Sequence, residues 1–214
     1  GGGYTFPRCA RTLVPRSAVD VVEIDPGVTA VSQSHLGLDP GLGIRSVHMD
    51  GRQFVTEAAD AGKYDLVTLD AVNDLSVPAH LLTKEFNEQV KKCLAPDGVY
   101  LLTVIDVLDR GRLTAAAVAT LKETYPHVEL LSASSQFAAD AQAVYVIYAS
   151  TVPLNLAAVR ETAVQAGGPP FTHRPPAEAV DGLLRQSPGM VLTDQYAPVD
   201  NLMAPVFRRR KLHD

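Results

Sequence analysis

Residues 19–26 read VDVVEIDP, a short β-branched run that closes on two carboxylates, Glu23 and Asp25, and then on proline. A continuous apolar run bounded by turn formers is typical of a strand that is buried on both faces of a parallel sheet. Proline in the first turn favours a helix, which we expect over Pro26 to Leu36. The stretch therefore predicts one strand-plus-helix unit with Glu23 at the junction.

The same unit recurs along the chain. Acidic or glycine-rich positions follow one another at intervals of roughly 20 to 25 residues, about the length of one strand-plus-helix unit. They are Gly1-Gly2-Gly3, Glu23 with Asp25, Asp50-Gly51, and Asp70. In an open parallel sheet the carboxyl ends of successive strands converge on one ligand-binding crevice. The spacing therefore predicts that these residues line a nucleoside site.

The remaining apolar and helical patterns complete the predicted fold. We expect strands over 19–24, 44–48, 66–69 and 99–105, with residues 95–98 as a turn, and helices over 7–13, 26–36, 51–61, 83–94 and 112–125. Residues 128–132 and 143–149 read as an antiparallel edge pair. This order predicts an α/β, class I methyltransferase-like (Rossmann-like) fold, a mostly parallel sheet with helices on both faces.

Two regions follow from this pattern. Residues 1–150 form the expected nucleoside-binding domain, and residues 151–214 form a C-terminal appendage with helices over 156–165 and 177–186. A glycine loop of this kind normally follows the central strand of the sheet, and here the sequence opens inside the loop. We therefore expect the chain to be a fragment that lacks its first strand.

Each position at a strand end has a chemical interpretation. Gly1, Gly2 and Gly3 let the backbone approach a ligand closely. Glu23 is expected to accept hydrogen bonds from ribose hydroxyls, with Asp25 starting the following helix. Asp50 is placed to accept from an adenine amino group, with Gly51 leaving room for the ring; a plain helix N-cap is the alternative for Asp50.

Asp70 leads into a long loop, residues 71–80, of the length that usually serves function. We expect any chemistry to lie there. His80 is either a general base or a loop histidine without a catalytic task. Asp106 and Asp109 either add negative charge to the cleft or lie in a solvated loop. Residues 193–198 are either a lid or a tail that Tyr196 and Leu202 pin to the surface.

Composition limits the function classes. The formal net charge of -5 argues against nucleic acid as a partner. Cys9 and Cys93 show no metal-ligand spacing, so we expect no metal and predict two buried free thiols, which suits a reducing cytoplasm. No apolar run reaches the length of a membrane span.

Five motifs together resemble one known family. They are GGGYTFPR (1–8), VDVVEIDP (19–26), DGRQF (50–54), YDLVTLDAVNDLSVPAHLLTKEF (64–86) and LAPDGVYLL (94–102). Together they resemble the spermidine synthase family of polyamine aminopropyltransferases over roughly residues 1–150. The segment VLTDQYAPVDNL (191–202) resembles bacterial spermidine synthase-like proteins, some of which are fused to membrane-spanning segments.

The resemblance implies decarboxylated S-adenosylmethionine as co-substrate and a polyamine such as putrescine as acceptor. It places Glu23 on the ribose, Asp50 on the adenine edge and Asp70 at the amine-activating position. Asn73 stands where the family has a second carboxylate, and Asp74 follows one position late; both are expected to bind substrate. The family's amino-terminal β-rich segment is absent, a homodimer remains open, and an upstream membrane-spanning region outside this chain would fit the resemblance.

Three functions remain open from the sequence. The first is a spermidine synthase-like transferase in the cytoplasm, with Asp70 as the activating carboxylate. The second is an S-adenosylmethionine-dependent methyltransferase on the same sheet. The third is a non-catalytic nucleoside-binding domain.

Overall fold

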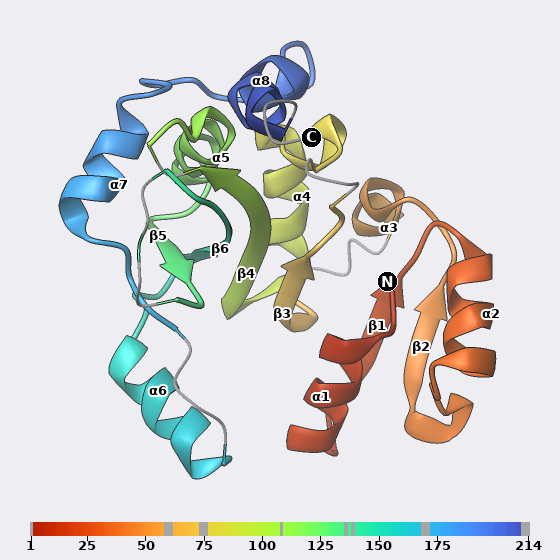
Figure 1. Cartoon of the computed structure of the whole chain (residues 1–214). Coiled ribbons are helices and arrows are strands. Elements are labelled where there is room, and N and C mark those ends of the chain that lie inside the picture. Colours follow the sequence, from red (N-terminus) through yellow and green to blue (C-terminus); the bar gives the residue numbers. More distant parts are fainter. Residues whose placement is uncertain are drawn as a thin grey trace. The chain divides into compact units, whose positions relative to one another are not determined.

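Two sheets carry the described part of the chain in the computed structural model (Figure 1). The described residues are 2–57, 62–72, 77–107, 109–134, 137, 140–167 and 172–210, without the side chains of 205 and 208–210. The chain divides into two compact units, Gly1–Ala58 and Ala59–Asp214.

The first unit holds a two-stranded parallel sheet. Strands β1 and β2 pair from Val19 opposite Ile44 to Val22 opposite Val47. Helix α1 contacts both strands. Its elements in chain order are α1 (Thr5–Leu13), β1 (Val19–Val22), α2 (Pro26–His35), the 3-10 helix η1 (Pro40–Leu42), β2 (Ile44–Val47) and α3 (Gly51–Glu57). The predicted strands and helices of this region are confirmed, and the predicted end of the third helix at Ala61 lies outside the described residues.

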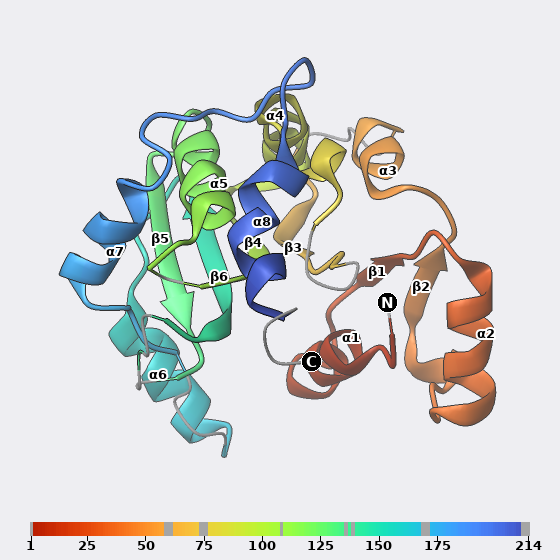
Figure 2. The ribbon, with the colours of Figure 1, turned by 45° about the horizontal axis from the view of Figure 1, so that its top comes forward.

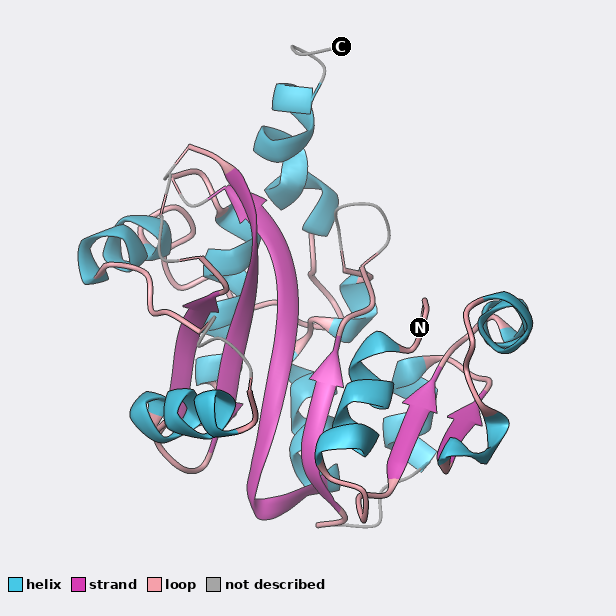
Figure 3. Cartoon of the chain, turned by 60° about the horizontal axis from the view of Figure 1, so that its bottom comes forward, coloured by secondary structure: helices cyan, strands magenta, loops and turns pink. Residues whose placement is uncertain are grey.

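The second unit holds a four-stranded sheet in the order β3-β4-β6-β5. Its strands are β3 (Tyr64–Leu69), β4 (Leu94–Val107), β5 (His127–Ser132) and β6 (Gln142–Ser150). Strand β3 is parallel to β4, while β6 is antiparallel to both β4 and β5. The predicted antiparallel pair of β5 and β6 is therefore confirmed. Within the four-stranded sheet, β5 is the edge strand and β6 lies between β5 and β4 (Figure 3).

The predicted turn at residues 95–98 lies within β4. Tyr64 of β3 is opposite Leu94, but Leu66 is opposite Val99, so the register shifts across this stretch. Residues 95–98 therefore interrupt the ladder without ending the strand. The turn-forming residues Pro96 and Gly98 produce an irregularity in place of a separate turn.

The second unit also contains helices. They are η2 (Ala79–Leu81), α4 (Lys84–Cys93), α5 (Arg112–Lys122), α6 (Leu156–Gln165), α7 (Ala177–Leu184) and α8 (Val199–Arg210). Helix α5 contacts β4 and β5, and also α4, α7 and α8. Figures 1 and 2 both show α8 beside α5. Helix α8 is a new element, because the sequence predicted only a tail there.

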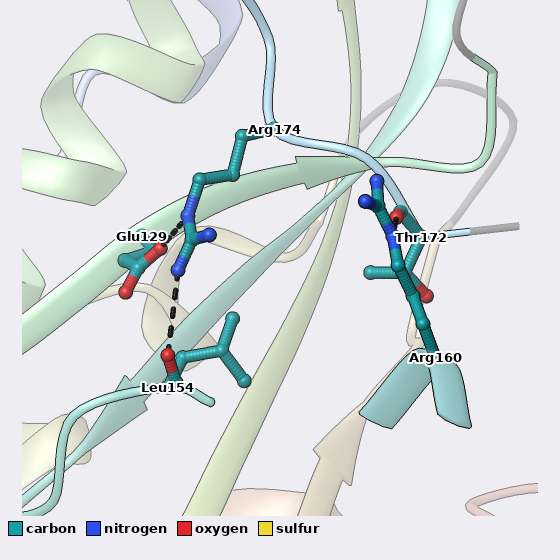
Figure 4. A network of polar contacts seen from close by, with 5 residues as sticks. All are labelled: Glu129, Leu154, Arg160, Thr172 and Arg174. Carbon is teal, nitrogen blue, oxygen red and sulfur yellow. Dashed lines mark hydrogen bonds and ion pairs between the residues drawn. The ribbon is translucent and has the colours of Figure 1, made fainter. Parts of the chain in front are cut away.

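Two arginines make contacts from the chain beyond residue 150, and one of them contacts the sheet (Figure 4). Arg174 Nε donates to Glu129 Oε2 of β5 at 2.5 Å, and its Nη2 donates to the Leu154 carbonyl at 3.4 Å. Arg160 of α6 donates from Nε to the Thr172 carbonyl at 2.9 Å. The Arg174 contact therefore joins the chain beyond residue 150 to β5, and the Arg160 contact joins α6 to the segment before α7.

Burial differs from the prediction at two places. Strand β3 is more exposed than a strand covered on both faces, with Leu66 42% exposed, because it lies at the end of its sheet as described. Cys93 is a buried free thiol as predicted, but Cys9 is exposed, so that prediction is wrong. Helix α1 has no buried residue, so its apolar spacing does not mark a buried face that would include Cys9. Among the described residues no helix is long and apolar enough to cross a membrane.

Candidate functional site

The glycine loop is held to helix α2. Gly2 has a φ of 47°, a left-handed conformation that favours glycine. Ser32 Oγ of α2 donates to the Gly2 carbonyl at 2.6 Å. A Cβ on Gly3 would meet Leu36 Cδ1 and Thr5 Oγ1 only at 3.7 Å, an ordinary contact. The backbone requirement for glycine is therefore at Gly2, and Gly1 lies outside the described residues.

Tyr4 fixes the other end of this loop. It has a φ of 57°, which is rare for a bulky residue, and its side chain is fully buried with Val21 and Leu38. Its hydroxyl is hydrogen-bonded to Thr29 Oγ1 of α2 at 2.7 Å and to Ser46 Oγ of β2 at 3.0 Å. A strained backbone that three elements hold in place is the kind found beside ligand sites.

Glu23 follows β1 directly. Its backbone N–H donates to the Val47 carbonyl at 3.0 Å, which continues the strand pairing. Its Oε1 accepts from the Asp25 backbone N–H at 3.0 Å. Partial burial alone would raise the pKa of Glu23, but the charged amino terminus of the chain and the backbone N–H groups of Asp25 and Ile24 lower the pKa on balance. Glu23 is therefore a half-buried, ionised acceptor at the carboxyl end of its strand.

Asp25 and Asp50 both begin helices. Asp25 Oδ1 accepts from the Gly27 N–H at 2.7 Å as the N-cap of α2, which confirms its predicted role. Asp50 Oδ1 accepts from the N–H groups of Arg52 and Gln53 at 2.8 and 3.2 Å, and Gly51 is the first residue of α3. The capping interpretation of Asp50 thus describes its local contacts, and its adenine contact stays a prediction.

Asp70 stands one residue beyond β3. The last pair of that strand sets Leu69 opposite Leu102 of β4. The side chain of Asp70 is exposed and has no hydrogen-bond or ion-pair partner within the described ranges. Asn73 and Asp74 lie outside the described residues. The second unit therefore presents one free carboxylate at the carboxyl end of β3, in the position that the sequence predicted.

Asp106 is a buried carboxylate whose role the sequence did not predict. It is 1% exposed, so a solvated loop is wrong for it. Its Oδ1 accepts from the Val107 N–H at 2.8 Å, and its Oδ2 accepts from Thr114 Oγ1 at 2.8 Å. Burial raises its pKa, although the hydrogen bonds from Thr114 and Val107 act in the opposite direction. Asp109 pairs with Arg110 at 3.6 Å at the surface.

The segment from Leu192 to Tyr196 is attached to the helices of the second unit. Leu192 is fully buried; its N–H donates to Thr120 Oγ1 at 2.9 Å, and its carbonyl accepts from the Lys84 N–H at 2.8 Å. The Asp194 N–H donates to Glu85 Oε2 at 3.1 Å. The pinned-tail interpretation is correct for Leu202 of α8, which is buried, as is Leu192. Tyr196 is 61% exposed and does not pin the tail.

No group of three or more metal-ligating side chains occurs in the part of the chain that the structure describes. The candidate residues of the first unit are the glycine loop with Glu23 and Asp50, and the candidate residue of the second unit is Asp70. Such groups suit hydroxyls, amines and cations.

Comparison with known proteins identifies the family. The spermine/spermidine synthase domain matches residues 10–155. The polyamine aminopropyltransferase of Vibrio vulnificus (strain CMCP6) is 36% identical over 99 residues, which are 46% of this chain and 33% of that protein. The match thus spans about a third of the length of this curated relative.

Two solved structures show the fold. A probable spermidine synthase from Corynebacterium glutamicum superposes with a TM-score of 0.72 at 20% identity, covering 92% of this chain and 71% of that one. Human methyltransferase-like protein 13, solved in complex with SAH, gives a TM-score of 0.62 at 23% identity and covers 94% and 85%. The predicted methyltransferase-like α/β fold is confirmed, and the chain belongs to the spermine/spermidine synthase domain family.

Proposed function

We propose that this chain transfers an aminopropyl group from decarboxylated S-adenosylmethionine to a polyamine such as putrescine. The observation that carries the proposal is Asp70, an exposed carboxylate without a partner among the described residues, at the carboxyl end of β3. Asp70 lies within residues 10–155, the range that matches the spermine/spermidine synthase domain, and the amine-activating position is assigned to it here. A cytoplasmic location belongs to the proposal, and the two free thiols suit it.

The donor is assigned to residues of the first unit. Glu23, which is ionised, would accept hydrogen bonds from the two ribose hydroxyls. Asp50 would accept from the adenine amino group, with Gly51 beside the ring. Gly2 and Gly3, held by Ser32 and Tyr4, would let the backbone approach the adenosyl group.

The acceptor chemistry is assigned to Asp70. A primary amine with a pKa of about 10.4 costs about 4.6 kcal/mol to hold neutral at pH 7. Asp70 would bind the ammonium form and then accept its proton, directly or through water. The nitrogen lone pair forms the new C–N bond as the C–S bond of the sulfonium breaks, and methylthioadenosine leaves. Asn73 and Asp74 would bind the far end of the amine.

The test is a pair of matched variants. Asp70→Asn keeps the size of the side chain and removes its charge, while Asp65→Asn removes an exposed charge from β3, the strand that precedes Asp70. Methylthioadenosine and spermidine are quantified after incubation with decarboxylated S-adenosylmethionine and putrescine. We expect Asp70→Asn to lower kcat about 10²- to 10⁴-fold, the range of general base catalysis. An Asp70→Asn variant as fast as Asp65→Asn would remove the assigned role.

A methyltransferase is the second candidate. The likeness to human methyltransferase-like protein 13 covers a larger share of that chain, 85%, than the likeness to the probable spermidine synthase, 71%. Parallel calorimetric titrations with decarboxylated S-adenosylmethionine, S-adenosylmethionine and methylthioadenosine separate the candidates. Preference for the decarboxylated donor supports aminopropyl transfer, and preference for S-adenosylmethionine supports methyl transfer. Binding without turnover of either donor would leave a nucleoside-binding domain.

A further inference from the structure

Helix α2 of the first unit buries hydroxyl groups in place of apolar side chains. Its buried residues are Thr29 and Ser32, which are 5% and 1% exposed. They are three positions apart and therefore lie on one face of the helix. Val31 of the same helix is 52% exposed. Because burying a polar group costs free energy unless it is hydrogen-bonded, the partners of these two hydroxyls indicate what the buried face does.

The two hydroxyls hold the two ends of the glycine loop. Ser32 Oγ donates to the Gly2 carbonyl at 2.6 Å, and Thr29 Oγ1 is hydrogen-bonded to the Tyr4 hydroxyl at 2.7 Å. Gly2 and Tyr4 are the described residues of this loop with left-handed backbones, at φ values of 47° and 57°. A left-handed backbone is unfavourable for tyrosine and persists only where the surrounding structure holds it. Helix α2 therefore fixes the loop at the two points where its backbone is left-handed.

Thr29 also contacts the segment that leads to Asp50. His48 Nε2 is hydrogen-bonded to Thr29 Oγ1 at 3.1 Å, and Ser46 Oγ is hydrogen-bonded to the Tyr4 hydroxyl at 3.0 Å. A hydroxyl has one donor and two acceptor positions, so Tyr4 and Thr29 can each make both of their bonds at once. The result is one chain of hydrogen bonds, Ser46–Tyr4–Thr29–His48, whose exposed end at His48 lies two residues before Asp50.

The residues assigned to the donor are connected through this helix and the end of β2, which lie side by side in Figures 1 and 2. Glu23 precedes α2, whose N-cap is Asp25. The Glu23 N–H donates at 3.0 Å to the carbonyl of Val47, the residue between Ser46 and His48. Groups that are held in place before a ligand arrives bind it with a smaller loss of entropy.

We propose that Thr29 and Ser32 are positioning residues for the donor, and that their hydroxyls hold the glycine loop in the conformation that admits the adenosyl group. The assignment rests on the proposed function and adds to it two residues that act through the loop. When the loop is held correctly for only part of the time, the apparent Kd rises as the inverse of that fraction. Loss of either hydroxyl therefore weakens donor binding and leaves the rate of the bound complex unchanged.

The test is calorimetric titration of matched α2 variants with methylthioadenosine. Ser32→Ala and Ser34→Ala are the same substitution, but Ser34 is exposed and its hydroxyl is bonded only within α2. Thr29→Val removes the other buried hydroxyl, and Thr29→Ser keeps it. We expect Ser32→Ala and Thr29→Val each to raise Kd about tenfold, the size expected for one or two lost hydrogen bonds. Ser34→Ala and Thr29→Ser should keep the Kd of the wild type.

A purely structural role of these hydroxyls predicts a different result. A variant that is only less stable contains fewer folded molecules, so it binds less ligand per chain at an unchanged Kd and loses kcat in proportion. A positioning role raises KM for decarboxylated S-adenosylmethionine and leaves kcat, KM for putrescine and the number of sites per chain unchanged. Steady-state kinetics and the calorimetric stoichiometry therefore distinguish the two roles.

The outcomes also separate this assignment from the proposed function. Wild-type Kd values in both Ser32→Ala and Thr29→Val would overturn the positioning role and leave the proposed function standing. Weaker methylthioadenosine binding in these two variants, with no aminopropyl transfer by the wild type, would support the positioning role and overturn the proposed transfer. A wild type that binds no methylthioadenosine would overturn both assignments.

Discussion

Asp106 at the end of β4 and Thr114 in the first turn of α5 are joined by two hydrogen bonds. Oδ2 of Asp106 accepts from the Thr114 backbone N–H at 3.0 Å and from its hydroxyl at 2.8 Å. Both side chains are almost fully buried. The N-cap residue of α5, Gly111, has no side chain to cap the helix, so a carboxylate from the preceding strand performs that task.

Replacing Thr114 by valine removes one of these hydrogen bonds without changing the shape of the side chain. Hydrogen bonds to charged groups contribute about 1.5–3 kcal/mol, and we expect Thr114→Val to lower the free energy of unfolding by that amount. Thr124→Val is the matched control, because Thr124 Oγ1 is buried without a partner among the described residues. Urea unfolding should show no loss for Thr124→Val; an equal loss in both variants would contradict the assignment.

The pH dependence of stability follows from the raised pKa of Asp106. Because burial raises this pKa above its ordinary value of 3.8, the folded protein holds the proton more tightly than the unfolded chain. The contribution of this carboxyl to stability is fully present below pH 3.8 and is lost as the pH rises through the folded pKa. The free energy of unfolding of Asp106→Asn minus that of the wild type should therefore increase from acid to neutral pH. A difference that is independent of pH would refute the prediction.

Tyr4→Phe tests the anchor of the glycine loop. The change keeps the buried ring and removes the hydroxyl that is bonded to Thr29 and Ser46. We expect the first unit to lose about 1–2 kcal/mol of stability, measured by hydrogen exchange of its backbone amides. Tyr196→Phe is the control, since Tyr196 is 61% exposed. Unchanged protection in Tyr4→Phe would show that the hydroxyl does not hold the loop.

Gly111 and Gly182 should respond in opposite directions to alanine. A Cβ on Gly111 would lie 2.5 Å from Leu183 Cδ1 and 3.0 Å from the Val107 carbonyl, so Gly111→Ala should cost about 1–3 kcal/mol of stability. Gly182 lies within α7, where a Cβ would meet only Arg185 Nη2 at 3.7 Å. Gly182→Ala should gain about 0.5–1 kcal/mol. Two losses, or two gains, in thermal unfolding would be inconsistent with this packing.

The sequence predicted the elements whose signals are local. β1, β2, β5 and β6 lie within two residues of their predicted ranges, because each apolar run is bounded by turn formers. Helix α8 was missed, since Pro205 lies between its buried residues Met203 and Val206, and proline disfavours the interior of a helix. The exposure of β3 was also missed, because burial depends on neighbouring strands that no local pattern reveals.

The candidate site residues also fall into two groups, those that a local pattern predicts and those whose surroundings depend on residues distant in sequence. Glu23, Asp50 and Asp70 could be placed at strand ends from sequence, since a strand end is a local feature. The buried contacts of Asp106 depend on Thr114, eight residues further along. The strained backbone of Tyr4 depends on Thr29 and Ser46, which are distant in sequence. Tertiary partners of this kind leave no periodic signal.

The burial of Leu192 and of α8 has a consequence for biosynthesis. Helix α5 and strand β4 are covered in part by α8, which starts at Val199. A chain emerging from the ribosome must therefore carry β4 and α5 incompletely covered until some ninety residues more have been translated. During that interval the nascent protein exposes apolar surface, and we expect chaperones that hold such surfaces to associate with it until α8 has left the ribosome and packed.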